Sequence, residues 1–302
     1  MNWVPLLFID DVCHQLSKPA FKQVGQLSGS WSNIGSKHRK KRRELKFRCK
    51  FVFQVNNHEV RYNFREHDCN FRIVTVADLN LEFDRITSFA WDSDSPNDKR
   101  VSRVSLREFE RDILPNIAPL VANCFWSYLS PQSRNQNRFF FNAFKNFPGF
   151  NEINVPEQGL ESRAFVARQV ELGNVQRLAL LGTGKWPEAE NLGETLKKFV
   201  SSARFQILSS PDLLRNGYEL FELFLERALA KELKRGASIS VSATNVDKNR
   251  LLALRPECRH DSKKEAWRIP DSNLRIRLRH GSGMLRGHGQ ITMEVCACKH
   301  VT

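Results

Sequence analysis

Residues 47–64 read FRCKFVFQVNNHEVRYNF, and their apolar side chains alternate with mostly polar ones on either side of Asn56-Asn57. The alternating apolar positions are Phe47, Cys49, Phe51, Phe53, Val55, Val60, Tyr62 and Phe64. A period of two is the spacing of a β-strand with one buried face, and adjacent asparagines are a turn signal. The stretch therefore predicts a β-hairpin, and it marks the point where the chain changes from helical to strand periodicity.

The segment before the hairpin, residues 4–45, has helical spacing instead. Pro5 suits the first position of a helix, where its missing N–H has no partner to lose. Apolar residues then recur three or four positions apart in three groups: Leu6, Ile9, Cys13 and Leu16; Phe21, Val24 and Leu27; Trp31 and Ile34. Lys18-Pro19 and Gly29 separate the groups, because the residue before a proline avoids helical geometry. We expect a module of three short helices over residues 1–45.

Between the hairpin and residue 150 the pattern mixes both periodicities. Short strands are expected at residues 72–76 and 85–91. Apolar residues from Phe109 to Phe125 recur at helical spacing, and Ser105 and Glu108 in front of them match a capping box. This pattern predicts a helix over residues 109–125 that starts at the box.

From residue 150 onward, strand and helix patterns alternate. Strands are expected to begin near Phe150, Val175, Phe205 and Ser238, at intervals of 25, 30 and 33 residues. Such spacing fits stacked strand–helix units in a leucine-rich-repeat-like arc, and it also fits an ordinary open α/β sheet. One or two more strands follow Trp267. The fold class is therefore α+β or α/β, with a mixed or parallel sheet in a second domain over residues 46–302.

The composition describes a chain that can fold around a core. Its 302 residues are 41% hydrophobic and 26% charged, which is ordinary for a globular protein, and no apolar run reaches the roughly 18 residues of a membrane span. Met1 to Phe8 lacks the basic start of a signal peptide. The seven cysteines are odd in number and scattered, which favours reduced thiols. We therefore expect an intracellular protein, in the cytoplasm, the nucleus or both.

The net charge of +14 is concentrated in two segments. Residues 37–50 hold nine lysines and arginines against Glu44, and residues 255–290 hold nine against four acids. The densest run in the first segment is Arg39, Lys40, Lys41, Arg42 and Arg43. This run has three interpretations: the solvated end of the third helix, a nuclear-import signal, or a surface for the phosphates of nucleic acid. Nucleic-acid binding through both segments therefore stays an alternative function.

The N-terminal segment resembles an F-box. Val4-Pro5 stands at the family's Leu-Pro opening, and the apolar groups that follow match its spaced leucines and isoleucines. The run Leu27-Ser28-Gly29-Ser30-Trp31 matches the family's apolar-Cys-Arg-x-Trp element. Two positions depart from the pattern, since Leu7 stands in place of an acid and Gly29 in place of an arginine.

Later features extend the resemblance over most of the chain, to a large nematode family of F-box-type proteins of unknown substrate. The residues that carry it are His38–Arg43, Arg177–Leu181, Trp186-Pro187 and Leu192–Val200. They resemble that family's basic helix end, apolar strand, Trp-Pro pair and amphipathic helix. The resemblance implies the small helical module in front of a larger recognition region.

The resemblance also implies a non-enzymatic adaptor. The module would bind the small adaptor subunit of a cullin-type ubiquitin ligase through apolar surface, and the rest of the chain would present a surface to an unknown protein substrate. The residues implied for adaptor binding are Val4, Pro5, Phe8, Ile9, Val12, Leu16, Phe21 and Trp31. For each of them, packing between the three helices is the competing interpretation.

Two glycine-rich stretches look like nucleotide sites but depart from the motifs. Leu181-Gly182-Thr183-Gly184-Lys185 lacks the first glycine of a phosphate loop, and Trp186 replaces its Ser or Thr. The glycines between Gly281 and Gly289 have the wrong spacing for a dinucleotide loop. Both stretches are better interpreted as turns.

A zinc site can be assembled only from loosely spaced residues. The candidates are Cys258, His260, Cys296, Cys298 and His300. Zinc signatures have close pairs with two to four residues between ligands, whereas single residues separate these. The sequence therefore predicts no metal, no cofactor and no catalytic residues.

Overall fold

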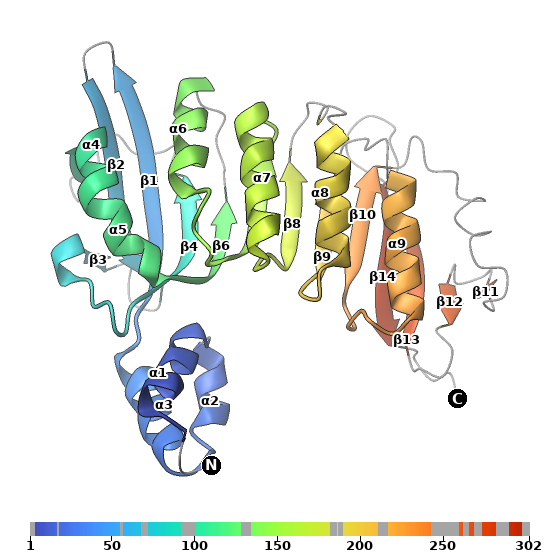
Figure 1. Cartoon of the computed structure of the whole chain (residues 1–302), viewed down its shortest axis with the longest axis horizontal. Coiled ribbons are helices and arrows are strands. Elements are labelled where there is room, and N and C mark those ends of the chain that lie inside the picture. The colour runs from blue at the N-terminus through green and yellow to red at the C-terminus, as the bar shows by residue number, and fades with distance from the viewer. Residues whose placement is uncertain are drawn as a thin grey trace. The chain divides into compact units, whose positions relative to one another are not determined.

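The structure is a computed structural model of the 302-residue chain. It describes residues 4–16, 18–54, 57–67, 72–91, 101–127, 134–181, 186, 190–210, 217–242, 260–261, 266–268, 274–281 and 290–297. The chain forms two compact units, Met1–Glu152 and Ile153–Thr302. The boundary predicted between residues 45 and 46 falls inside the first unit, where the helical module and the hairpin belong to one compact body. Both units combine helices with a β-sheet, so the mixed α/β class is confirmed (Figure 1).

Short helices form the start of the first unit, as the apolar spacing predicts. They are α1 (Leu6–Gln15), the 3-10 turn η1 (Lys18–Ala20), α2 (Phe21–Val24) and α3 (Ser30–Lys41). Gly29 precedes α3 with a φ of 66°, a left-handed conformation that glycine adopts at little cost. The helices enclose a small core of Ile9, Cys13, Phe21 and Val24. Gly35 permits this packing, because a Cβ there would lie 2.5 Å from a Val24 methyl group.

The predicted hairpin is confirmed and starts the sheet of the first unit. Strands β1 (Glu44–Gln54) and β2 (Asn57–Glu66) pair antiparallel with Phe47 opposite Phe64. Strand β4 (Arg85–Trp91) runs parallel to β1, and β6 (Val121–Ser127) runs parallel to β4. Two short strands, β3 (Ile73–Val74) and β5 (Ser102–Ser105), pair with β2. The sheet is therefore mixed.

An aromatic core lies between this sheet and the helices on one of its faces. Those helical elements are α4 (Leu106–Glu108), the π-helical turn η3 (Phe109–Ile113), α5 (Leu114–Ile117), the 3-10 turn η4 (Ala118–Leu120) and α6 (Arg134–Phe144). Phe47 lies 4.7 Å from Phe89 between ring centroids, and Phe51 lies 5.6 Å from Phe109. Phe144 contacts five other rings and is fully buried. The core therefore forms because the side chains at every second position of these strands are apolar, mostly aromatic, and point toward the helices.

Two sequence predictions in the first unit are wrong in extent. The helix expected over residues 109–125 ends at Leu120, and Val121 already has extended backbone and begins β6. Pro119 lies in the closing 3-10 turn, and from Cys124 to Trp126 alternate residues are buried, so strand pairing replaces helical geometry. The strand expected at 72–76 shrinks to β3, because a capped 3-10 turn, η2 (Val76–Asp78), follows at once. The capping box of Ser105 and Glu108 is confirmed.

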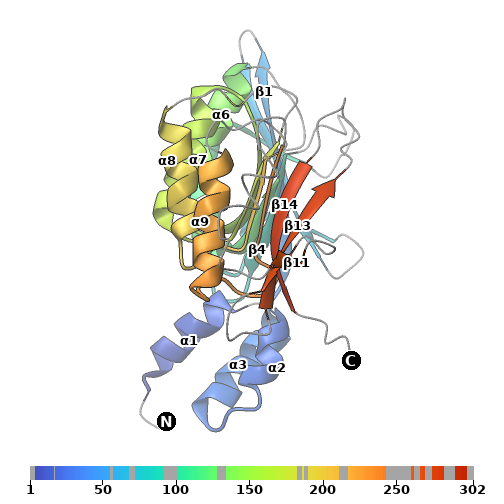
Figure 2. The ribbon, with the colours of Figure 1, turned by 90° about the vertical axis from the view of Figure 1, so that its right-hand side faces the viewer.

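Strand β7 (Phe150–Pro156) spans the boundary, and the second unit continues with the predicted alternation. Its strands are β8 (Arg177–Leu181), β9 (Ile207–Ser210) and β10 (Ser238–Ser242), and its helices are α7 (Leu160–Leu172), α8 (Glu190–Ser201) and α9 (Gly217–Leu229). β8, β9 and β10 are parallel neighbours, and Figure 2 shows the three helices on one side of them. This order confirms the parallel strand–helix succession, while the leucine-rich-repeat interpretation stays a prediction.

Antiparallel strands complete the second unit. They are β14 (Gln290–Ala297), β13 (Leu274–Gly281), β12 (Ala266–Arg268) and β11 (His260–Asp261). β13 and β14 are the one or two strands expected after Trp267, whereas β11 and β12 were not predicted. β14 pairs with β10 and with β13, and Ile276, Met293 and Val295 of these two strands are buried.

Among the described helices, none combines the length and the apolar character needed to cross a bilayer.

Candidate functional site in the N-terminal helical module

The module presents large apolar side chains to solvent. Exposed fractions are 61% for Leu6, 81% for Leu7, 54% for Phe8 and 46% for Leu27. Leu6, Leu7 and Phe8 are consecutive on the first turn of α1, and Leu27 lies between α2 and α3. Single exposed leucines are common on protein surfaces, but several large ones in one small module indicate an interaction surface.

The geometry of α1 explains why Leu7 stays outside. The buried face of α1 consists of Ile9 and Cys13, four residues apart. Leu7 precedes Ile9 by two residues, which places it about 160° around the helix axis, since each residue turns by about 100°. The core of the module is therefore filled without Leu7, and no rotation of α1 could bury both faces within it.

The structure divides the residues implied for adaptor binding into three groups. Ile9 and Phe21 are buried in the core of the module, so they support its shape and do not form its surface. Val4, Leu16 and Trp31 are partly buried against that core, and Val12 is half-buried. Pro5 and Phe8 are exposed.

Sequence reasoning missed Leu6, Leu7 and Leu27 as surface residues. Leu6 and Leu27 were grouped with the buried stripes, because helical spacing alone does not distinguish the edge of an apolar face from its centre. Leu7 was noted only as a departure from the family pattern. The sequence signal that could have identified Leu7 is its position on the side of the helix opposite the apolar stripe of Ile9 and Cys13.

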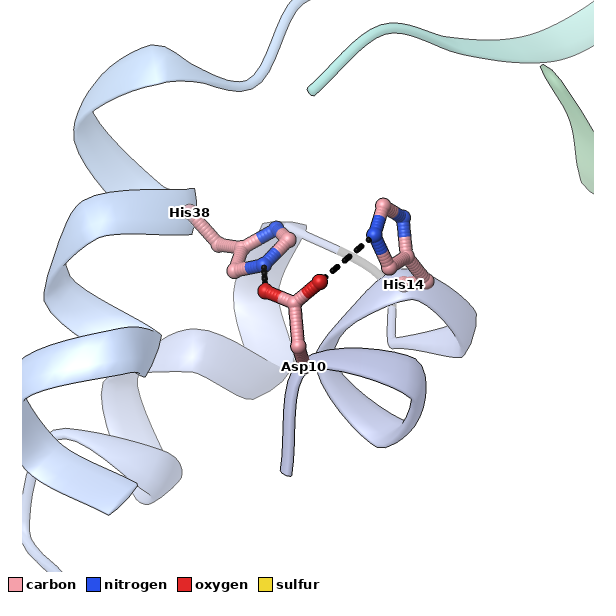
Figure 3. Close-up of side chains that lie close together, drawn as sticks. All are labelled: Asp10, His14 and His38. Atoms are coloured by element: carbon pink, nitrogen blue, oxygen red, sulfur yellow. Dashed lines mark hydrogen bonds and ion pairs between the residues drawn. The ribbon is translucent and has the colours of Figure 1, made fainter. Parts of the chain in front are cut away.

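A polar cluster joins α1 to α3 (Figure 3). The Asp10 carboxylate approaches Nε2 of His38 at 2.7 Å and Nε2 of His14 at 3.0 Å. His38 is fully buried, and its ring stacks on Phe21 at 6.0 Å between centroids. One carboxylate can thus accept hydrogen bonds from two imidazole N–H groups, which ties α1 to α3.

Two arginines hold the C-terminal end of α1. Arg42, from the end of α3, donates to the carbonyls of Cys13 at 2.9 Å and His14 at 3.2 Å, and also to the carbonyl of Leu16. Arg85, from β4, donates to the same His14 carbonyl at 3.1 Å. The last carbonyls of a helix lack partners within it and attract cations. These contacts therefore fix α1 on the sheet of the first unit.

Both guanidiniums are buried, and burial favours their neutral form. Desolvation lowers the pKa of Arg42, and it lowers the pKa of Arg85 to about 10. Arg85 still carries its charge at neutral pH, because a pKa of about 10 lies well above 7. It therefore places a positive charge at the C-terminal end of α1, where the helix dipole is negative.

Asp10, His14 and His38 also have the donor set of a metal site, since their ligand atoms lie within 4.8 Å of one another. Two imidazoles and a carboxylate can bind zinc. The surroundings oppose a divalent cation, however, because Arg85 and Lys37 both interact electrostatically with Asp10. In addition, the buried Nδ1 of His38 has no hydrogen-bond partner among the described residues, whereas ligating histidines normally donate through their second nitrogen. The cluster therefore fits a hydrogen-bonded clamp better than a metal centre.

The predicted nucleic-acid or nuclear-import run divides into two parts. Arg39, Lys40 and Lys41 are exposed on α3. Arg42 is buried at the end of α1, and Arg43 donates to both carboxylate oxygens of the buried Asp84, at 2.7 and 2.6 Å. That hydrogen bond raises the pKa of Arg43. Only the first three residues of the run are therefore available to an external ligand.

The other candidate motifs lie largely outside the described residues. Residues 182–185 of the phosphate-loop-like stretch are outside them, while buried Trp186 donates from Nε1 to the Leu181 carbonyl at 3.3 Å. Among the glycines of the second stretch, Gly281 ends β13 and the others are outside. Of the zinc candidates, His260 begins β11 and Cys296 lies on β14, whereas Cys258, Cys298 and His300 are outside.

Comparison of the chain with known protein families and with curated proteins gives no match. A functional conclusion for this chain therefore has to be argued from the residues and the geometry described above.

Proposed function

We propose that this protein is a non-enzymatic interaction adaptor whose N-terminal module docks on the small adaptor subunit of a cullin-type ubiquitin ligase. The single observation that supports this proposal most is the row of exposed apolar residues Leu6, Leu7 and Phe8 on α1. Their position coincides with the Val4-Pro5 opening by which the segment resembles an F-box. Docking would bury side chains that the module leaves in water.

The energetics of burial make this surface adequate for binding. Fully burying one leucine or phenylalanine side chain contributes about 1.5–3 kcal/mol. Three such side chains give a hydrophobic contribution of several kcal/mol, before the costs of association are subtracted. Because Arg42 and Arg85 already hold α1 in place, the module loses little further freedom on docking. A preorganised surface of this kind favours specific association.

Under this proposal, the remainder of the chain recognises a protein substrate and performs no reaction. The buried Cys124 supports that assignment, because burial holds the pKa of its thiol well above its usual range. Such thiols are poor nucleophiles at neutral pH.

Co-purification with the ligase adaptor subunit tests the proposal. The full chain should retain the adaptor through affinity purification, and Leu7→Glu should abolish retention. Leu160→Glu is the matched control, because Leu160 is 73% exposed at the start of α7 in the second unit. Absence of a complex with the unmodified chain, or equal loss with both variants, would contradict docking through α1.

One observation favours the alternative, nucleic-acid binding. The face of the first unit's sheet that points away from the aromatic core carries cations on neighbouring strands, directly across from one another. Lys46 on β1 faces Arg65 on β2. Arg61 on β2 faces Lys50 on β1 and also Arg103 on β5. Arg61 is also ion-paired with Glu59 on its own strand. Like charges directly across a strand pair repel, so an anionic ligand would lessen this repulsion. Measuring oligonucleotide affinity against salt concentration tests this function, since released counterions set the slope. Tight binding at physiological salt, weakened by charge reversal at Lys46 and Arg103, would favour it over the adaptor.

A further inference from the structure

A cavity of about 430 Å³ opens at the end of the β1–β2 hairpin in the first unit. Its lining residues are Phe53, His58, Glu110, Arg138, Phe139, Asn142 and Ala143. They come from β1, β2, η3 and α6, so the cavity lies where the sheet and its covering helices meet. Ligand sites in proteins commonly measure roughly 300–1,000 Å³, and this cavity falls within that range.

Aromatic rings form the apolar part of the cavity. Phe53 and His58 are opposite one another in the hairpin, with ring centroids 4.9 Å apart, and Phe53 lies 6.1 Å from Phe139. Phe51, two residues earlier on the same face, is fully buried, whereas Phe53 and Phe139 are only partly covered. The cavity is thus the place where the aromatic core reaches the surface.

Glu110 supplies a carboxylate at the edge of these rings. It lies on the π-helical turn η3, beside Phe109, whose ring is buried against Phe51. No hydrogen bond or ion pair joins the Glu110 carboxylate to any residue that the structure describes, whereas Asp112 on the same turn is paired with Arg111. π-helical turns frequently occur at functional sites. Glu110 is therefore an acid available to a ligand.

We propose that this cavity binds a lysine or arginine side chain of the protein that the chain recognises. The identity of the partner as a protein rests on the proposed adaptor function, whereas the chemistry of the ligand rests on the cavity alone. The aliphatic stem of a basic side chain packs on apolar surface while its charged head reaches a polar group. Phe53 and Phe139 offer the apolar surface, cation–π attraction adds to it, and Glu110 receives the charge.

Arg138 determines how selective the cavity is. It lines the cavity one helical turn before Asn142, on α6, and it is exposed. Arg138 also interacts with another group of the protein, and its positive charge opposes a basic ligand. Removal of the Glu110 charge and removal of the Arg138 charge should therefore change the affinity in opposite directions.

Ligand-observed saturation-transfer NMR on the full chain tests the inference with three small probes. They are Nα-acetyl-lysine methylamide, the norleucine analogue that lacks only the ammonium group, and the glutamate analogue. The lysine probe should bind more tightly than the norleucine probe, and the glutamate probe should bind most weakly. Equal binding of lysine and norleucine probes, or preference for glutamate, would overturn the proposal.

Charge-neutralising variants locate the binding in this cavity. Glu110→Gln should weaken the lysine probe by about threefold, the size expected for an exposed ion pair, and Arg138→Gln should strengthen it. Asp112→Asn removes an equal charge from the same turn but outside the cavity, and it should leave the affinity unchanged. An equal loss of affinity for the lysine probe in Glu110→Gln and Asp112→Asn would show that only the net charge of the protein matters, and it would overturn the proposed site. These affinity measurements do not depend on whether the chain binds the ligase adaptor subunit. Glu110→Gln should leave co-purification with that subunit unchanged.

Discussion

The helical module and the sheet of the first unit differ in where their large apolar residues lie. The sheet turns Phe47, Phe51 and Phe89 inward, where α6 and η3 complete a core of interlocking rings. The hydrophobic core of the module has four buried apolar residues, and Leu6, Leu7 and Phe8 lie exposed outside it. A core of that size cannot use the outer face of α1. The contrast shows that the apolar residues of the sheet are buried in its core, whereas Leu6, Leu7 and Phe8 of α1 are left exposed and are the residues assigned to the partner in the proposed function.

The largest expected effect tests the sheet side of this contrast. Phe144→Ala should lower the free energy of unfolding by about 3–5 kcal/mol, because it leaves a cavity among five aromatic neighbours. Urea unfolding of the full chain measures the change. Leu7→Ala is the comparison, and it should change stability by less than about 0.5 kcal/mol, as expected at an exposed site. Comparable losses in both variants would remove the distinction between the two regions.

The next effect concerns how the module is held. Arg42→Met keeps the length of the side chain but removes the hydrogen bonds to the carbonyls of Cys13, His14 and Leu16. Since a hydrogen bond from a charged donor contributes about 1.5–3 kcal/mol, we expect a loss of at least about 2 kcal/mol. Hydrogen exchange should show faster opening of α1.

Lys41→Met provides the control for Arg42→Met, because Lys41 is the neighbouring residue and is exposed. It should leave both stability and exchange nearly unchanged. If Arg42→Met behaved like this control, the end of α1 would be held by other contacts.

The smallest effect lies in the sheet region, at the capping box. Hydrogen bonds from the Ser105 side chain and backbone lower the pKa of Glu108 below its ordinary value of 4.5. A carboxyl whose folded pKa is lowered stabilises the fold fully above its ordinary pKa, and this contribution is lost as pH falls through the lowered value. Glu108→Gln should therefore flatten the fall in stability below pH 4.5, measured by urea unfolding at several acidic pH values. An unchanged slope would show that the box carries no charge-dependent stability.

The sequence predicts the elements whose determinants are local. Alternating apolar residues predict β1 and β2 as strands, and the Ser105 box marks the start of α4. The register was not predicted, since Asn57, expected in the turn, is already paired with Gln54. The sequence predicts helix at β6 because Val121 and Phe125 continue the four-residue apolar spacing of Ile113 and Ile117. In that stretch, pairing with β4 decides the backbone, and pairing is not a local property.

The candidate site was predicted less completely, for a related reason. Arg42 belongs to a basic run in the sequence, yet it binds carbonyls 26 to 29 residues earlier in the chain. No periodicity indicates such a contact. Likewise, Leu6 shares its spacing with the buried Ile9, and only the assembled module shows that one is exposed and the other is not. The sequence shows that the module is rich in apolar residues, but only the exposed fractions in the structure show which of them could form an interface.

The most direct test of the account is a calorimetric titration of the full chain with the ligase adaptor subunit at several temperatures. Burial of α1 predicts a negative heat-capacity change. Leu7→Glu should weaken binding by about thirtyfold or more, which corresponds to the loss of one buried leucine, while Leu160→Glu binds as the unmodified chain does. Binding without a negative heat-capacity change, or with equal affinity for Leu7→Glu and the unmodified chain, would contradict the claim that α1 is the docking surface.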